Sequence, residues 1–350
     1  MSTMRGLAFY GPRDIRLEDV PRPELQDAGD VLLRIDTTAI CGSDLHPYHG
    51  KIDIEEGFVL GHEYTGTVEA TGGGVDQLEE GDHVVGSFMV SCGKCWWCRR
   101  GQHSKCIGIG VFGMGMAFGD LPGAQAEYMR VPNADLTLRK VPDGLSDEQV
   151  LFVGDILTTG YDAVRKAGIT PGDTVAVIGA GPVGLCTMMA AKALGAGNVV
   201  AVDMVAERLK LAESLGAIAV NPSEQEADDV VLELTDWRGA DLVVDAVGHE
   251  SALKACFPLV RMGGTISVPG VYNEDEISIP FGDMWLKNVT MFTGIANIQG
   301  HMDEVLELVK DGKLDPKAII SHRMGLSEAV EGYELFDRKE ALKVILDPRS

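Results

Sequence analysis

Four cysteines that could hold a metal ion lie close together in one short stretch of the chain. Their spacing is C-x2-C-x2-C-x7-C, and the residues are Cys92, Cys95, Cys98 and Cys106. Four thiolates can surround one tetrahedral zinc ion and leave no coordination position open, so such a site is structural. Because four of the seven cysteines are clustered in this way, the pattern favours metal binding in a reducing compartment over a disulfide framework.

A second set of donors has a different composition. Cys41 and the pair His62-Glu63 offer a thiolate, an imidazole and a carboxylate, which are groups that suit zinc. Glycines flank both motifs, and both lie at the ends of expected strands. A lone cysteine and histidine are more often core residues, so the context decides here. A catalytic zinc site needs a third protein donor and one position left for the substrate.

A glycine-rich turn typical of phosphate binding begins at Gly179. The stretch Gly179-Ala-Gly-Pro-Val-Gly184 follows an apolar run of strand length and opens a helical pattern. Gly181 admits a pyrophosphate, Gly184 lets helix and strand pack closely, and the first turn of the helix offers N–H groups to phosphates. We expect cofactor contacts from Gly179, Gly181, Pro182, Val183, Gly184, Asp203, Arg208 and Val247.

Asp203 is the residue expected to select the cofactor. It ends the next expected strand, where a carboxylate can accept hydrogen bonds from both adenosine ribose hydroxyls and repels a 2′-phosphate. Met204 and Val205 supply no cation beside it. The sequence therefore favours NAD over NADP.

The elements that position these residues change in character near residue 150. Before it, short strands alternate with glycine and proline turns, over 31–37, 65–70, 83–90 and 126–131. After about residue 172, strands are expected over 174–179, 198–203, 217–221, 240–247, 264–269 and 288–294, with helices over 182–194, 205–215, 223–234 and 251–260. This alternation predicts the α/β class, with a doubly wound parallel sheet of the Rossmann type.

The last fifty residues return to a different pattern, with expected helices over 301–310 and 326–337 and a strand over 341–346. They are expected to rejoin the first domain. The domain prediction is therefore a discontinuous catalytic domain, 1–153 and 295–350, which carries both zinc sites, and an NAD-binding domain over 154–294.

Charge is the unusual feature of the composition. The chain has 53 acidic and 30 basic residues and a formal net charge of −23. Such a surface repels nucleic acid. No apolar run suggests a signal peptide or a membrane span, so a cytoplasmic protein without a membrane partner is expected. The acidity fits either an ordinary cytosolic enzyme or adaptation to high salt.

Taken together, these motifs resemble the medium-chain zinc-dependent alcohol dehydrogenase family over essentially the whole chain. The residues that carry the resemblance are Cys41-Gly-Ser-Asp, Gly61-His-Glu, the four cysteines, the glycine-rich turn, Asp203, and the closing segments that begin at His322 and Phe336. The resemblance implies a mostly β, GroES-like catalytic domain beside the Rossmann domain. It also implies two zinc ions per chain and a homo-oligomer, with a tetramer favoured and a dimer possible.

The resemblance assigns Cys41 and His62 as catalytic zinc ligands, Asp44 as the partner of the His62 ring, and Glu63 as a carboxylate that can bind the metal transiently. In many members the third ligand is a cysteine. Here Asp155 stands at that place, as in the formaldehyde and secondary-alcohol dehydrogenases, which the chain resembles there.

Two further roles follow from the resemblance. Ser43 and His46 match the family's proton relay, although His46 could also be a plain surface histidine. Lys343 falls where the family places a basic residue on the pyrophosphate.

The expected function is hydride transfer between a small alcohol and NAD, or reduction of an aldehyde or ketone in the reverse direction. The alternatives are a polyol or threonine dehydrogenase, and a zinc-stabilised dinucleotide-binding protein without turnover.

Overall fold

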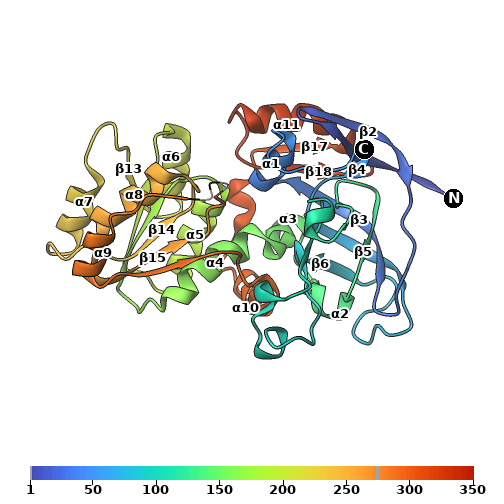
Figure 1. Cartoon of the computed structure of the whole chain (residues 1–350), viewed down its shortest axis with the longest axis horizontal. Helices are drawn as coiled ribbons and strands as arrows, with labels where there is room; N and C mark the ends of the chain where they lie inside the picture. The colour runs from blue at the N-terminus through green and yellow to red at the C-terminus, as the bar shows by residue number, and fades with distance from the viewer. Residues whose placement is uncertain (1, 273, 275) are drawn as a thin grey trace. The chain divides into compact units, whose positions relative to one another are not determined.

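A computed structural model of the chain describes residues 2–272, 274 and 276–350 (Figure 1). The chain forms two compact units. The first consists of Met1–Asp155, Asn297–Asp311 and Ile319–Ser350, and the second of Ile156–Ala296 and Gly312–Ala318. Within the described part of the chain, every helix is too short or too polar to cross a membrane.

The first unit is built on mostly antiparallel sheets, in which only the β17–β18 pair of the described strands is parallel. A three-stranded sheet has the order β2-β1-β4, a larger one the order β10-β6-β5-β3-β18-β17 with β9 also on β3, and β7 pairs with β8. The strands are β1 (Thr3–Gly11), β2 (Asp14–Pro21), β3 (Val31–Ile40), β4 (Phe58–Val59), β5 (Glu63–Thr71), β6 (His83–Gly86), β7 (Met89–Val90), β8 (Gly110–Val111), β9 (Tyr128–Val131), β10 (Leu138–Lys140), β17 (His322–Gly325) and β18 (Val344–Asp347). The helices of this unit are α1 (Leu45–Tyr48), α2 (Ala134–Thr137), α3 (Asp147–Val150), α10 (Ile298–Lys310) and α11 (Ala329–Asp337).

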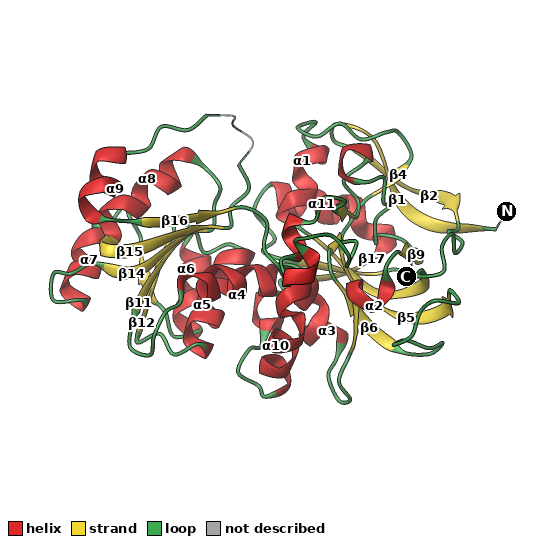
Figure 2. Ribbon diagram, turned by 60° about the horizontal axis from the view of Figure 1, so that its bottom comes forward, coloured by secondary structure: helices red, strands yellow, loops and turns green. Residues whose placement is uncertain are grey.

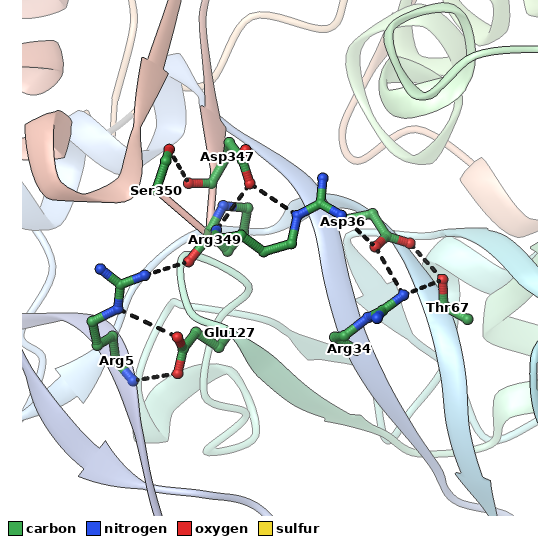
Figure 3. A network of polar contacts seen from close by, with 9 residues as sticks. Arg5, Arg34, Asp36, Thr67, Glu127, Asp347, Arg349 and Ser350 are labelled. Carbon is green, nitrogen blue, oxygen red and sulfur yellow. Dashed lines mark hydrogen bonds and ion pairs between the residues drawn. The ribbon is translucent and has the colours of Figure 1, made fainter.

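The closing strand β18 completes the larger sheet, because it pairs antiparallel with β3. A polar network next to its end ties this segment to the first strands (Figure 3). Arg5 donates to the carbonyl of Pro348 over 3.1 Å, and Arg349 lies 3.2 Å from Asp347 and 3.9 Å from Asp36. Exposed ion pairs contribute at most about 1 kcal/mol each. The pairing of β18 with β3 therefore contributes more than these ion pairs to holding the closing segment in place.

The second unit contains one parallel sheet with the order β13-β12-β11-β14-β15-β16. Its elements are α4 (Ile156–Ala167), β11 (Thr174–Ile178), α5 (Pro182–Ala193), β12 (Asn198–Val202), α6 (Ala206–Ser214), β13 (Ile218–Val220), α7 (Ala227–Leu234), β14 (Ala240–Asp245), α8 (Glu250–Leu259), β15 (Val260–Val268), α9 (Phe281–Lys287) and β16 (Thr290–Thr293). In Figure 2, α4 and α5 lie on one side of the sheet and α8 and α9 on the other. Every residue of β11 is buried, as expected of a parallel strand that is covered on both faces. The predicted doubly wound sheet is confirmed.

Several expected elements differ from the structure in their bounds, and two of these differences have a clear local cause. The strand expected over 83–90 is broken into β6 and β7, because the N–H groups of Ser87 and Phe88 donate out of the sheet, to Thr137 and Gly154. The helix expected over 223–234 begins only at Ala227. Asn221 accepts hydrogen bonds from the backbone and hydroxyl of Ser223 and holds that segment as a turn.

Candidate metal centres and dinucleotide-binding site

Three donors of different type meet at one buried point of the first unit. Cys41 lies just after β3, His62 just before β5, and Asp155 just after the 3-10 helix η5 (Leu151–Gly154). The Cys41 thiol lies 3.4 Å from Oδ2 of Asp155, and Nε2 of His62 lies 3.3 Å from the same oxygen. All three side chains are buried, and one donor atom of each lies within 4.8 Å of the others.

Sheet register and a close backbone approach produce this meeting. Ala39 in β3 lies opposite Glu63 in β5, so the residues just beyond these positions are neighbours. Asp155 is held from the other side, because the Phe88 N–H donates to the carbonyl of Gly154 over 2.9 Å. A side chain on Gly154 would clash with the Gly86 carbonyl. Only a glycine at 154 lets Asp155 approach so closely.

The donor set fits a zinc ion. Donors about 2.0–2.3 Å from a tetrahedral zinc lie roughly 3.5 Å from one another, and the separations of 3.3 and 3.4 Å match this. Burial raises the pKa of the Cys41 thiol, so a thiolate at this position needs a cation beside it. Three protein donors leave one position of a tetrahedral ion open.

Asp44 holds the ring of His62. Oδ1 of Asp44 lies 3.1 Å from His62 Nδ1, which leaves Nε2 directed at the donor set. Oδ2 of Asp44 accepts hydrogen bonds from the Cys41 N–H over 2.9 Å and from the Gln125 amide over 3.2 Å. Tyr333 donates in turn to Gln125 over 2.8 Å. The sequence analysis missed Gln125 and Tyr333, since neither lies in a recognisable motif.

Glu63 lies outside the three-donor set. Its carboxylate pairs with the ammonium group of Lys343, and both side chains are fully buried. Burial raises the pKa of Glu63 to about 7, although Lys343 lowers it. Lys343 is enclosed with Glu63 in this structure, and its expected phosphate contact stays a prediction. A transient metal contact of Glu63 stays a prediction.

Ser43 and His46 follow Cys41 in the 3-10 helix η1 (Gly42–Asp44) and in α1. Both are partly exposed. Burial lowers the pKa of His46, and the positive charge of Lys51 lowers it further. The proton relay of these two residues stays a prediction.

The four cysteines of the second motif gather as expected. The sulfur atoms of Cys92, Cys95, Cys98 and Cys106 lie within 4.8 Å of one another. The backbone N–H groups of Cys98 and Ile107 lower the pKa of Cys95 to about 6. The N–H groups of Cys92 and Gly108 donate to the sulfur of Cys106. Hydrogen bonds of this kind favour thiolates, so this lobe suits a closed zinc site.

The beginning of α10 holds the cysteine lobe in place. The amide of Asn297 donates to the Gly101 carbonyl over 2.7 Å and accepts from the His103 N–H over 2.9 Å. Gln299 accepts from the Ser91 hydroxyl over 2.9 Å and donates to the Met89 carbonyl over 3.1 Å. Asn297 and Gln299, which belong to neither set of metal donors, therefore hold the lobe by hydrogen bonds.

The glycine-rich turn in the second unit joins β11 to α5. Gly179 has a φ of +93°, which favours glycine. A side chain on Gly184 would clash with the Gly179 carbonyl, whereas around a Cβ on Gly181 the nearest atom is Nη1 of Arg208, at 3.9 Å. Gly181 therefore leaves open space at the N-terminus of α5, next to a cation, where a phosphate can approach. Pro182 and Val183 form the first turn of this helix.

Asp203 follows β12 and faces this turn. Its carboxylate accepts hydrogen bonds from the Ala180 N–H over 2.7 Å and from the Val205 N–H over 2.8 Å. Nη1 of Arg208 lies 4.0 Å from Asp203. The expectation that no cation lies beside Asp203 was therefore wrong, because the first turn of α6 brings Arg208 back to it.

Val247 lies against the glycine-rich turn, since a Cβ on Gly179 would be 2.6 Å from Cγ2 of Val247. About half of the Val247 side chain is exposed. The sequence analysis missed the residue that holds it, Asp245, whose carboxylate accepts the Val247 N–H over 2.9 Å.

Comparison with known proteins identifies both units. Residues 27–143 match the alcohol dehydrogenase GroES-like domain, and residues 182–311 match the zinc-binding dehydrogenase family. The predicted combination of a GroES-like and a Rossmann domain is confirmed.

Individual relatives match over nearly the whole chain. Zinc-type alcohol dehydrogenase B of Aspergillus flavus is 41% identical over 98% of this chain and 81% of the relative. The solved alcohol dehydrogenase TADH of Thermus sp. ATN1 has a TM-score of 0.96 and 46% identity, over 98% of this chain and 99% of the other. A zinc-binding dehydrogenase of Sinorhizobium meliloti, solved with bound NADP, has a TM-score of 0.87 and 27% identity, over 99% of this chain and 100% of the other.

Proposed function

This chain belongs to the medium-chain zinc-dependent alcohol dehydrogenase family of oxidoreductases, and from that premise we propose that it transfers hydride between a small alcohol and NAD. The observation that carries the proposal is the buried set of Cys41, His62 and Asp155, with donor atoms within 4.8 Å of one another. These three protein donors leave one position of a tetrahedral zinc ion open for the substrate, whereas a structural zinc site is filled by four protein donors.

The first role of these residues is to hold and neutralise a divalent ion. One thiolate and one carboxylate carry two negative charges, and His62 adds a neutral nitrogen. Bound Zn²⁺ supplies a Lewis acid that lowers the pKa of an alcohol, and NAD supplies the hydride acceptor. Asp44 fixes the ring of His62 and, through Cys41 N–H, the start of η1. Ser43 and His46 accept the alcohol proton and pass it toward solvent.

The cofactor proposed is NAD. The Asp203 carboxylate already accepts two backbone hydrogen bonds and is held in place for ribose hydroxyls. The NADP complex of the Sinorhizobium meliloti relative indicates that dinucleotide choice has to be measured for each member. Arg208 beside Asp203 is compatible with either cofactor, and the carboxylate is what disfavours the 2′-phosphate.

The substrate proposed is a small, mostly apolar alcohol, or the corresponding aldehyde or ketone. Methionine and aromatic residues are frequent in the loop 111–118, which we assign to the pocket wall. Polyols and threonine are the competing substrates within the same family.

Two measurements test the proposal. Metal analysis of the purified protein should find two zinc ions per chain, and NADH fluorescence should rise with small alcohols in the presence of NAD. Faster turnover with polyols or threonine would support the alternative substrates. Two zinc ions and tight NADH binding without turnover of any alcohol would support the non-catalytic alternative.

We also propose that copies of the chain associate, with a tetramer favoured over a dimer. The support is an apolar surface on the second unit, where Phe281, Trp285 and Leu286 of α9 are more than 60% exposed and β16 is an edge strand. Copies with a net charge of −23 can approach only where charge is low. Light scattering should show an oligomer that Trp285→Glu weakens, and a wild-type monomer at micromolar concentration would overturn this.

A further inference from the structure

We propose that Asp245 is a positioning residue of the cofactor site, whose buried carboxylate holds the turn after β14 against the loop after β15 and so places Val247 on the glycine-rich turn. The inference deepens the proposed function and rests on it, because it concerns how this chain binds NAD. Asp245 belongs to none of the motifs described above.

The carboxylate of Asp245 binds two segments at once. It is the last residue of β14 and is fully buried. Its Oδ1 accepts the N–H groups of Val247 over 2.9 Å and Gly248 over 3.1 Å, while Oδ2 accepts the hydroxyl of Tyr272 over 2.5 Å. Both oxygens are therefore engaged by neutral donors from two loops. A buried carboxylate is tolerated when its lone pairs are filled in this way.

The two loops meet backbone to backbone. Gly248 has a φ of +76°, and a side chain there would clash with the Val271 carbonyl. A side chain on Gly270 would clash with the Gly248 nitrogen. The Gly270 N–H donates to the Asp245 carbonyl over 3.1 Å, so Asp245 contributes both its main chain and its side chain to this junction.

The junction reaches the cofactor site through Val247. The Ala246 N–H donates to the Ile178 carbonyl at the end of β11, and Val247 packs on Gly179 in the turn that follows β11. β11 and β14 are neighbours at the centre of the sheet, where the strand order changes direction. Dinucleotides bind at the carboxyl ends of strands at this point. Val247 and Val271, which lies beside the junction, are each about half exposed. Their exposed surfaces are therefore available as an apolar wall for the cofactor.

A merely structural turn would give a different result from a positioning residue, and the same strand provides the control. Asp241 lies at the other end of β14, accepts the Thr174 N–H over 2.8 Å and pairs with Arg261 over 2.6 Å. Asp241→Asn removes a comparable carboxylate from the same strand without touching Val247. It should lower Tm and leave the Kd for NADH unchanged.

The test compares holoenzyme variants by NADH fluorescence titration and steady-state kinetics. Asp245→Asn should raise the Kd for NADH and the KM for NAD by about tenfold, with kcat at saturating NAD within about twofold of wild type, because such a split marks lost binding and not lost chemistry. Tyr272→Phe, which keeps the ring and removes only the hydroxyl, should raise both constants by about threefold. Zinc content should stay unchanged in every variant.

Wild-type Kd in Asp245→Asn, or an equal rise in Asp241→Asn, would overturn the inference. If Asp245→Asn does not fold, Tyr272→Phe decides: an unchanged Kd overturns the inference and a raised Kd with unchanged Tm supports it. A wild-type enzyme that binds no NADH would instead overturn the proposed cofactor, which is a distinguishable result.

Discussion

Glu63 and Lys343 form an ion pair in which neither side chain is exposed to solvent. The partners come from opposite ends of the chain, at the start of β5 and just before β18. The ring of Phe152 lies 5.3 Å from the ammonium group. Breaking such a pair leaves one charge buried without compensation, which costs about 3–5 kcal/mol.

Lys343→Met should therefore lower the free energy of unfolding by about 3 kcal/mol or more, measured by urea denaturation at pH 7. The double variant Glu63→Gln with Lys343→Met should regain much of the loss, because no charge is then left buried. The control is Lys140→Met, which removes an exposed pair with Asp82 and should cost at most about 1 kcal/mol. If Lys343→Met and Lys140→Met lowered the free energy of unfolding equally, burial of the Glu63–Lys343 pair would not contribute to stability.

Asp155→Ala should remove one of two zinc ions per chain, as measured by atomic absorption on gel-filtered protein. Turnover should collapse, because an alcohol without the metal keeps a pKa near that of water. NADH binding should persist, since the glycine-rich turn and Asp203 lie in the second unit. Asp155→Cys should recover the metal and part of the rate. Two zinc ions in Asp155→Ala would mean that the third ligand is another residue, with Glu63 as the next candidate.

Cys95→Ser should remove the other zinc ion and lower Tm, because metal binding in a closed site contributes directly to folding. Turnover per folded molecule should change much less. Cys256→Ser is the matched control: Cys256 is fully buried in α8 and belongs to neither donor set, so two zinc ions should remain. Full stability with lost turnover in Cys95→Ser would reverse the roles of the two sites.

Asp203→Gly should shift cofactor preference toward NADP. The carboxylate that repels a 2′-phosphate is removed, and Arg208, now 4.0 Å from that carboxylate, is left to bind the phosphate. The ratio of kcat/KM for NADP to that for NAD should rise at least tenfold. Asp203→Gly with Arg208→Ala should lose most of this gain. A wild-type enzyme that uses both cofactors equally would contradict the role of Asp203.

The pair His83–Asp147 should make stability depend on pH. Nε2 of His83 lies 2.6 Å from Asp147, and this hydrogen bond raises the pKa of His83 although burial opposes it. Because the folded pKa is raised, the contribution is fully present below about pH 6.5, the unfolded value, and is lost as the pH rises through the folded value. His83→Gln should therefore be less stable than wild type at pH 6 by up to about 1 kcal/mol and nearly equal at pH 9. A difference that is constant with pH would rule out a titrating His83.

The sequence was sufficient for features that repeat locally. The alternation of apolar strands and helices predicted the parallel sheet. The spacing of Cys92, Cys95, Cys98 and Cys106 predicted a four-cysteine cluster, and the four sulfur atoms do lie together. The same reasoning failed where partners are remote. Nothing near Gln125 or Tyr333 indicates that the two side chains contact each other, and nothing near Asp245 indicates its contact with Tyr272. A single side chain leaves no periodic pattern.

Local pattern also misled in two places. The run 83–90 is mostly apolar, but the N–H groups of Ser87 and Phe88 donate to residues 137 and 154, which no window around the run contains. The absence of a cation after Asp203 was judged from the next two residues, whereas a helical turn returns Arg208 to the carboxylate.

The pairing of β18 with β3 joins residues about 300 positions apart, and this has a consequence for synthesis on the ribosome. The large sheet of the first unit cannot be completed until the last strand has been translated, and long-range pairing of this kind is slow to form. The parallel sheet, made entirely of residues between 174 and 293, can form before that. During this interval Glu63 has no counter-ion, since Lys343 arrives only with the closing strand. The first unit therefore finishes folding after the second, although it contains the earlier strands.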